Sequence, residues 1–326
     1  MANNRTARKR AGKSSQKKAL YVALVAVVLV VVAMCSVIYG IYKIRDGVTE
    51  SGAQGASAQE GNAASADSDD GQAIDLTIAG EPITAGEFRY ALAETKSAVV
   101  ASCGSGEQSI GADFWRANTA MCAPEASTQP RSEAERMQAQ LTSSYSPTSK
   151  TLCAAATHPL EFALCKAVRL LEQQHAVYQQ AVAAGHMHSA SWNDVMQNAS
   201  SENAENERAR SKGEAVYGLD RYEVPVYLSK YLSQLKDQYI NDDAAPGMAV
   251  SDDQVKQHYA ENTWDFGSEI SAIPSESERW EIIAANVKED LRSTIYYDLV
   301  SARVRNMDIV MNRANLVDFV KSALSS

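Results

Sequence analysis

An apolar run without a charged residue extends from Leu20 to Tyr42 and is the strongest hydrophobic signal in the chain. Because a helix rises about 1.5 Å per residue, such a run can cross a hydrocarbon core of about 30 Å. Seven Lys and Arg precede it within residues 1–18, and only Lys43 and Arg45 follow it closely. The positive-inside bias therefore predicts a transmembrane helix over 19–44, with residues 1–18 as a basic cytoplasmic tail.

This pattern predicts an uncleaved signal anchor and a single-pass cell-membrane protein whose C-terminal domain is extracytoplasmic. A cleaved signal peptide is disfavoured, because its apolar region has about 7–15 residues. Small and polar residues without an aromatic side chain follow at 45–73. They cannot form a core that offsets the entropy of ordering the chain, which predicts a disordered linker.

Hydrophobic periodicity predicts that residues 74–326 form a mainly α domain. Apolar and polar residues alternate over 74–78, which is typical of a short strand. Thr84 then begins a helix, because Glu87 three positions later completes a capping box. Further segments have apolar residues at three- and four-residue steps and predict helices, namely 160–184, 189–210, 225–240, 252–261 and 276–305.

Two shorter signals complete the predicted fold. Residues 307–312 predict a second strand, which would pair with 74–79, and Leu316, Phe319 and Val320 predict a last helical turn or two. The expected fold class is therefore mainly α, with a small two-stranded β pairing, preceded by one transmembrane helix.

The charge of the chain changes after the apolar run. Of the 31 Lys and Arg and the 40 Asp and Glu, residues 1–46 contain nine and one, which leaves 22 against 39 for residues 47–326. The resulting net charge of −17 argues against a nucleic-acid partner and is typical of a soluble acidic domain.

Cysteines concentrate around the part of the domain that is least able to hold itself by packing. Cys103, Cys122, Cys153 and Cys165 border or lie within 102–158, an insertion that contains Ser, Gly and Pro. In an oxidising compartment four cysteines predict disulfides, with three connectivities open. Pairing Cys103 with Cys122 and Cys153 with Cys165 would close the shortest loops. A zinc site is the alternative, although the close CxxC pairs usual in such sites are missing.

Residue patterns for catalysis are missing from the sequence. It lacks a phosphate loop, a Gly-rich nucleotide fingerprint, an HExxH helix and a GxSxG elbow. His186 and His188 are better explained by a solvated turn than by a metal, and His175 by a position in the core. We therefore expect no enzyme, no cofactor and no metal site.

Four stretches, in this order, resemble the N-terminal domain of the SurA/PrsA family of extracytoplasmic foldases and chaperones. They are Ile78–Thr84 with Glu87-Phe88, the helix that ends at Ala183-Ala184-Gly185, Tyr217-Gly218-Leu219 before a helix, and Val250–Val255 with His258–Asn262. The likeness covers 74–100 and 159–312. It implies a helical chaperone domain in which an apolar cleft between helices holds extended client segments.

One domain of the SurA/PrsA proteins has no counterpart in this sequence. In such proteins a parvulin-type prolyl isomerase domain follows the last of these stretches, whereas here only 263–274 precede the helix 276–305. Isomerase activity is therefore not expected, and no catalytic residue is carried over. A client-binding surface needs exposed apolar groups rimmed by polar ones. The candidate client-binding residues are large and aromatic: Phe88, Tyr227, Tyr231, Trp264 and Trp280.

These observations predict a membrane-anchored holdase that binds unfolded or translocating secreted or envelope proteins. The alternative is a non-catalytic interaction subunit that docks one fixed partner in a cell-envelope complex. A third hypothesis is an isomerase whose site is not recognised. Client breadth separates the first two, since a holdase acts on unrelated unfolded proteins and an interaction subunit does not.

Overall fold

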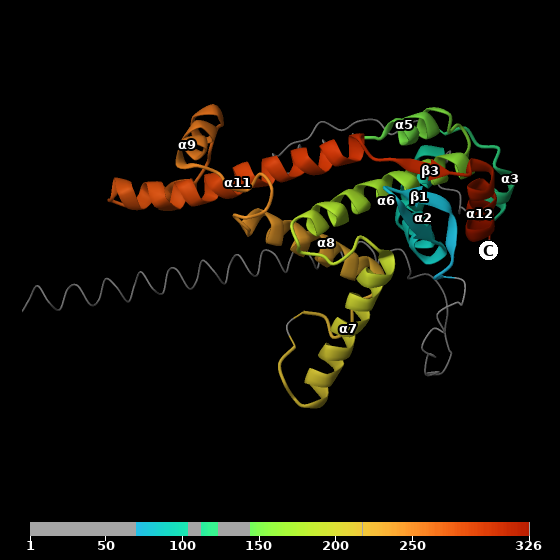
Figure 1. Ribbon diagram of the computed structural model, residues 1–326, viewed down its shortest axis with the longest axis horizontal. Coiled ribbons are helices and arrows are strands. Elements are labelled where there is room, and N and C mark those ends of the chain that lie inside the picture. The colour runs from blue at the N-terminus through green and yellow to red at the C-terminus, as the bar shows by residue number, and fades with distance from the viewer. Residues whose placement is uncertain (1–69, 104–111, 123–143, 217, 326) are drawn as a thin grey trace, which may run out of the picture. The chain divides into compact units, whose positions relative to one another are not determined.

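The computed structural model describes residues 70–103, 112–122, 144–216 and 218–325. These residues belong to one structural unit, which extends from Ala64 to Ser326. Its helices and strands follow one another in this order (Figure 1): β1 (Ala73–Ile78), β2 (Glu81–Thr84), α2 (Ala85–Cys103), α3 (Ala112–Ala117), α5 (Pro147–Ala154), α6 (Pro159–Ala183), α7 (Trp192–Ser211), α8 (Val224–Asn241), α9 (Asp252–Glu261), α10 (Gly267–Ser271), α11 (Glu276–Arg305), β3 (Ile309–Met311) and α12 (Arg313–Ser325).

Strand β1 lies at the centre of a three-stranded antiparallel sheet with the order β2-β1-β3. Ala79 and Gly80 join β1 to β2, with φ angles of 53° and 84°. Two positive φ angles in a two-residue hairpin loop are typical of a type I′ turn, which matches the twist of the paired strands. Strand β3 returns from near the C-terminal end of the chain and places Ile309 opposite Ile78.

The structure corrects the predicted fold class in two respects. The sheet has a third strand, β2, where the sequence pattern indicated only a turn and a helix cap. Among the residues that the structure describes, no helix is long and apolar enough to cross a membrane. The predicted span at 19–44 lies outside those residues, as do the basic tail and most of the linker. The described residues therefore support no transmembrane helix and no single-pass membrane localisation, and their fold class is mainly α with a small three-stranded sheet.

Helix α6 is the element on which most of the others pack, and 17 of its 25 residues are buried. Helices α2, α5, α8, α11 and α12 all contact it, and strand β1 does so as well (Figure 1). Pro159 begins the helix at a position where its missing N–H group leaves no hydrogen bond unmade. The sequence predicted one apolar stripe on this helix, but partners on several sides bury far more of its surface than one stripe.

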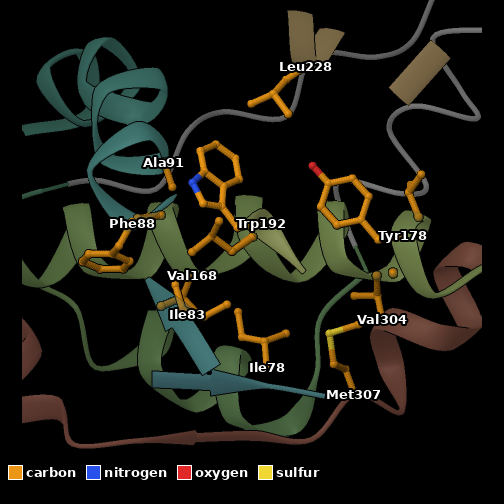
Figure 2. Close-up of a cluster of buried hydrophobic side chains, with 14 of the residues drawn as sticks. Ile78, Ile83, Phe88, Ala91, Val168, Tyr178, Trp192, Leu228, Val304 and Met307 are labelled. Carbon is orange, nitrogen blue, oxygen red and sulfur yellow. The ribbon is translucent and has the colours of Figure 1, made fainter. Parts of the chain in front are cut away.

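Side chains from the sheet and from seven other helices meet around α6 in one hydrophobic core, part of which is drawn in Figure 2. Complete burial of a large apolar side chain stabilises a fold by about 1.5–3 kcal/mol relative to leaving it in water. The fully or almost fully buried members include Ile78, Ile83, Phe88, Val168, Tyr178, Leu228 and Val304.

The core also contains a buried polar pair. His175 Nε2 of α6 lies 2.8 Å from Glu87 Oε1 of α2, and both side chains are 1% exposed. The sequence assigned Glu87 to a capping box with Thr84. The structure keeps half of that box, because Thr84 Oγ1 accepts a hydrogen bond from the Glu87 N–H group. The Glu87 carboxylate instead joins α2 to α6, since a buried carboxylate needs a polar partner.

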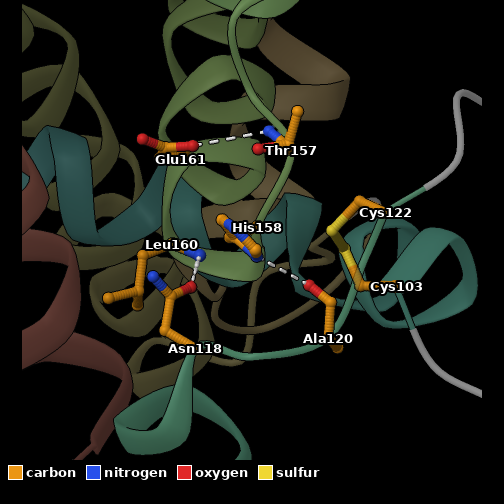
Figure 3. Close-up of a disulfide and its surroundings, with 8 residues drawn as sticks. All are labelled: Cys103, Asn118, Ala120, Cys122, Thr157, His158, Leu160 and Glu161. Atoms are coloured by element: carbon orange, nitrogen blue, oxygen red, sulfur yellow. Dashed lines mark hydrogen bonds between the residues drawn. A yellow bond between two sulfur atoms is a disulfide. The ribbon is translucent and has the colours of Figure 1, made fainter.

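The four cysteines form two disulfides, Cys103–Cys122 and Cys153–Cys165. This pairing closes the two shortest loops and leaves no thiol among them for a zinc ion. Around the first disulfide, Asn118 Oδ1 accepts a hydrogen bond from the Leu160 N–H group at 2.9 Å, and the His158 ring lies 3.1 Å from the Ala120 carbonyl oxygen (Figure 3). The insertion is therefore tied to the first turn of α6.

Three helices differ from the sequence-based expectation. Helix α5 was not predicted; it forms because Pro147 occupies the first turn and the Ser146 hydroxyl caps it. Helix α12 extends to Ser325, well beyond the one or two turns predicted, because Leu316 and Val320 are buried against the core. Helix α10 was not predicted.

We expect the first disulfide to contribute measurably to stability. Closing a loop of about 15 residues stabilises a fold by about 3 kcal/mol in the chain-entropy model. Replacing Cys103 and Cys122 together with alanine should lower the free energy of unfolding by about that amount, as measured by denaturant titration. A reductant should destabilise the wild type more than this variant. Equal stability of the two proteins without reductant would contradict the prediction.

A second prediction concerns Glu172 of α6, whose carboxylate accepts a hydrogen bond from the Ser146 N–H group at 2.8 Å. Burial raises the pKa of Glu172, and hydrogen bonds from Ser146 offset this only in part. A carboxyl group whose pKa is raised on folding stabilises the fold at low pH, and the contribution is lost as pH rises through the folded-state pKa.

The stability advantage of the wild type over Glu172→Gln should therefore shrink between about pH 5 and about pH 8, above the usual Glu pKa of about 4.3. Glu205→Gln on the exposed surface of α7 is the control and should show no such trend. Denaturant titrations at both pH values measure the difference, and a pH-independent difference would refute the assignment.

Candidate functional site

Four aromatic side chains from α9, α11 and the segment between them form one cluster, called here the aromatic cluster: Tyr259, Trp264, Phe266 and Trp280. Tyr259 contacts each of the other three, and its ring centroid lies 5.5 Å from that of Trp280 in an edge-to-face arrangement. Trp264 and Phe266 stack with their centroids 5.5 Å apart and their planes 7° apart. Such contacts each contribute about 0.5–1.5 kcal/mol beyond the area they bury.

The aromatic cluster is separate from the hydrophobic core. None of its four residues belongs to the core or to the partly buried side chains packed against it. Tyr259 is 37% exposed, and the other three are half-buried. Ile282, two residues after Trp280, is 41% exposed. The cluster is therefore apolar surface that the fold itself does not bury, and exposed surface of this kind marks sites of interaction.

Helix caps and one hydrogen bond hold the aromatic cluster in shape. Ser251 and Gln254 cap the start of α9 reciprocally, and the Ser275 hydroxyl caps α11 by accepting from the Glu278 N–H group at 3.2 Å. Trp264 Nε1 donates to the Tyr259 carbonyl oxygen at 3.0 Å. Because the polar group of this indole is satisfied within the cluster, its ring remains for apolar contact.

One polar contact lies beside the cluster. His258 Nε2 of α9 is 2.8 Å from Asp290 Oδ2 of α11, and the His258 ring lies 5.7 Å from that of Trp264. Val255 of α9 and Val287 of α11 are buried, and the two helices contact each other. Helix α9 is thus fixed on α11 by an apolar contact and a polar one, and the aromatic cluster lies on a supported surface.

The structure separates the five predicted client-binding residues into two groups. Trp264 and Trp280 lie together in the aromatic cluster. Phe88 is fully buried beside Phe319, and Tyr227 is 2% exposed, so neither offers a surface in this fold. Burial raises the pKa of Tyr227 to about 12, with the neighbouring Tyr231 as a smaller cause. Tyr231 stacks on Tyr227 and is partly buried against the core.

Tyr259 and Phe266 also belong to the site, although they were not among the predicted residues. Their signal is local density: three of the eight residues from Tyr259 to Phe266 are aromatic, whereas aromatic residues make up 7% of the chain. Helical periodicity does not show this signal, because Trp264 and Phe266 lie between two helices and have no apolar stripe to join.

A groove between α6, α8 and α11 is the second candidate site. A cleft between helices is what the resemblance to the SurA/PrsA family implied. The groove has a volume of about 330 Å³, near the lower end of the about 300–1,000 Å³ usual for ligand pockets. Its walls mix apolar and polar groups, namely Leu170, Val177, Leu232, Gln173, Lys236 and Tyr297. The aromatic cluster brings four aromatic rings together outside the core, so we take it as the candidate site.

Metal binding finds no support in this part of the chain. Within the described ranges, no group of three or more His, Cys, Asp or Glu side chains is placed to hold a metal ion. His186 lies 3.4 Å from Asp242, and its ring contacts that of Tyr239. This histidine therefore packs at the end of α8.

The chain matches no family model and no solved structure. Over 151 residues it is 32% identical to a protein of Bifidobacterium longum subsp. longum named "Chaperone for lacto-N-biosidase". The matched region is 46% of this chain and 52% of that protein, so the chain spans about half the length of the curated relative it matches. This similarity supports a chaperone role and a protein client. It does not single out the SurA/PrsA type.

We expect substitutions in the aromatic cluster and in the core to differ strongly in their effect on stability. Phe88→Ala should destabilise the protein by about 3–5 kcal/mol, because it leaves a cavity in the core. Trp280→Ala removes a larger side chain but should cost about 1 kcal/mol or less, because surface substitutions have small effects. Denaturant titration measures both. Comparable losses would show that the cluster is a second core and not a surface.

Proposed function

We propose that the protein is a chaperone that holds apolar segments of an incompletely folded client at the aromatic cluster. The observation that carries this proposal is the mutual contact of Tyr259, Trp264, Phe266 and Trp280 on partly exposed surface outside the core. Tyr and Trp are the side chains that dominate protein-binding surfaces, because they offer a large rigid area with a polar edge. The similarity to a named chaperone supports the same conclusion.

Holding requires no chemical step, and we propose that the protein has no isomerase or other enzymatic activity. The order of its elements resembles the N-terminal domain of the SurA/PrsA family, but the segment 262–275 between α9 and α11 contains only the short α10. A separate catalytic domain has no room in that segment. The proposal is therefore a holdase of the SurA/PrsA type that lacks the isomerase part.

The client is proposed to be a secreted protein, met while it is unfolded. The two disulfides support this, since such bonds form in oxidising compartments and are rare in the cytosol. Chains that have just been translocated expose apolar segments and aggregate readily. An aromatic surface that binds such segments reversibly would keep them apart until they fold.

One observation favours a narrower second function. The name of the relative specifies a single client, lacto-N-biosidase. A dedicated chaperone of this kind corresponds to the interaction subunit with one fixed partner that the sequence left open. In that case the aromatic cluster would recognise one segment of one enzyme, and unrelated unfolded proteins would not be protected.

The test is the aggregation of chemically unfolded clients after dilution, followed by light scattering with and without the full chain. Lacto-N-biosidase and two unrelated enzymes serve as clients. We expect the wild type to reduce scattering and Trp264→Ala/Trp280→Ala to lose at least about half of that effect, because the cluster is a hot spot of the kind described for binding surfaces. The wild type should not accelerate prolyl isomerisation of a model peptide.

Tyr297→Ala, in the groove between α6, α8 and α11, is the control and should retain the effect. If Tyr297→Ala loses protection while Trp264→Ala/Trp280→Ala retains it, the groove and not the aromatic cluster is the client-binding site. Protection of lacto-N-biosidase alone would favour the dedicated chaperone. Absence of protection for every client would refute the proposed function.

A further inference from the structure

The surface around the aromatic cluster is strongly acidic. From Asp252 to Asp290 the sequence has ten Asp and Glu against three Lys and Arg, a net charge of −7 with histidine neutral, whereas the whole chain of 326 residues has −9. Aromatic side chains for apolar contact and a local excess of carboxylates thus occur on the same elements. Neither feature alone identifies a ligand, but together they define the chemistry of what would fit.

Three carboxylates lie close in the sequence to the aromatic residues of the cluster. Asp265 stands between Trp264 and Phe266 in the sequence, and Glu281 directly follows Trp280; both acids are exposed. Glu276 is exposed and precedes Trp280 by four positions, so it lies on the same face of α11.

In the described part of the chain, no Lys or Arg side chain pairs with these carboxylates. Among the described residues, Glu276, Glu281 and Asp265 form no salt bridge. Asp265 accepts a hydrogen bond from the Gly267 N–H group at 2.9 Å, which fixes the carboxylate without neutralising it. Within the described residues, no salt bridge neutralises these three carboxylates.

The three basic residues of this region are engaged elsewhere. Lys256 lies 3.8 Å from Asp253 on the same helix, and Lys288 lies 3.8 Å from Asp243, which follows α8. Arg279 Nη1 donates to the Ile273 carbonyl oxygen at 3.0 Å. All three cations are already counted in the net charge of −7, so the region has an excess of carboxylates that an external cation could pair with.

From this charge complementarity we propose that the aromatic cluster selects client segments in which an apolar stretch is flanked by Lys or Arg. The apolar side chains contact the four rings, and the flanking cations lie against Asp265, Glu276 and Glu281. This inference rests on the proposed function, because it specifies which client segments that site binds. Acidic client segments are repelled, so the cluster discriminates among apolar segments of equal hydrophobicity.

The test uses three fluorescein-labelled peptides with one apolar core and with Lys, Ser or Glu at both ends, and measures binding to the full chain by fluorescence anisotropy. We expect the Lys peptide to bind about tenfold more tightly than the Glu peptide at low salt, as several weak exposed ion pairs would give. At about 1 M salt, where the Debye length is about 3 Å, the preference should fall below about twofold.

Two variants with the same change in net charge complete the design. Asp265→Asn/Glu276→Gln/Glu281→Gln should lose most of the preference for Lys while it still binds the Ser peptide. Glu205→Gln/Glu207→Gln/Glu214→Gln removes three exposed carboxylates outside the aromatic cluster and should keep the preference.

The outcomes separate this inference from the proposed function. Equal binding of the three peptides, or tighter binding of the Glu peptide, overturns the inference and leaves an apolar binding site in place. Equal loss of preference in both triple variants also overturns it, because a general charge effect would then explain the result. If no peptide binds, or if Trp264→Ala/Trp280→Ala binds as the wild type does, the aromatic cluster is not the binding site and the proposed function fails as well.

Discussion

The fold depends on one constraint, which is the burial of α6 along most of its length. A helix surrounded on several sides cannot place its polar residues in water, so each of them needs a partner inside the protein. His175 meets Glu87, and Gln180 accepts hydrogen bonds from Arg303 and donates one to the Tyr239 hydroxyl. These contacts attach α2, α8 and α11 to α6 at specific points. Hydrophobic contact alone would allow the helices to slide along one another.

The length of α11 follows from this arrangement and has a functional consequence. Its buried residues begin at Val287, and from there the helix packs on α6 and α8. Arg292 fixes this part, because it donates to the Ile240 carbonyl oxygen at 3.1 Å and pairs with Asp243. The preceding residues, 276–286, are not buried; α9 contacts them through Trp280 and contacts the packed part of α11 through Asp290. The aromatic cluster therefore lies on a helix whose other half is firmly held.

The insertion is held in place mainly by a disulfide and hydrogen bonds, because few of its described side chains are buried. The part of the insertion around α3 has Trp115 as its one almost fully buried large side chain in the described residues. The Cys103–Cys122 disulfide, the Asn118 contact to α6 and the packing of α3 on α12 hold it in place. A segment with so little apolar surface gains more from a cross-link, because the cross-link restricts the unfolded chain as well.

The sequence by itself determined the elements whose signals are local. Capping residues such as Ser251 and Ser275, proline at the first turn of α6, and apolar steps of three and four gave α6, α8, α9 and α11 nearly to the residue. The β1–β3 pairing was also predicted, because the two strands alternate or are apolar throughout. Only the tertiary structure decided which aromatic side chains remain exposed. Phe88, Tyr227 and Trp280 all lie on amphipathic helices in the sequence, and nothing local distinguishes them. Burial is set by what packs on the other side, and that partner comes from a distant part of the chain: Phe319 covers Phe88. Trp280 has only its neighbours in the aromatic cluster, since the helix that carries it extends beyond the core.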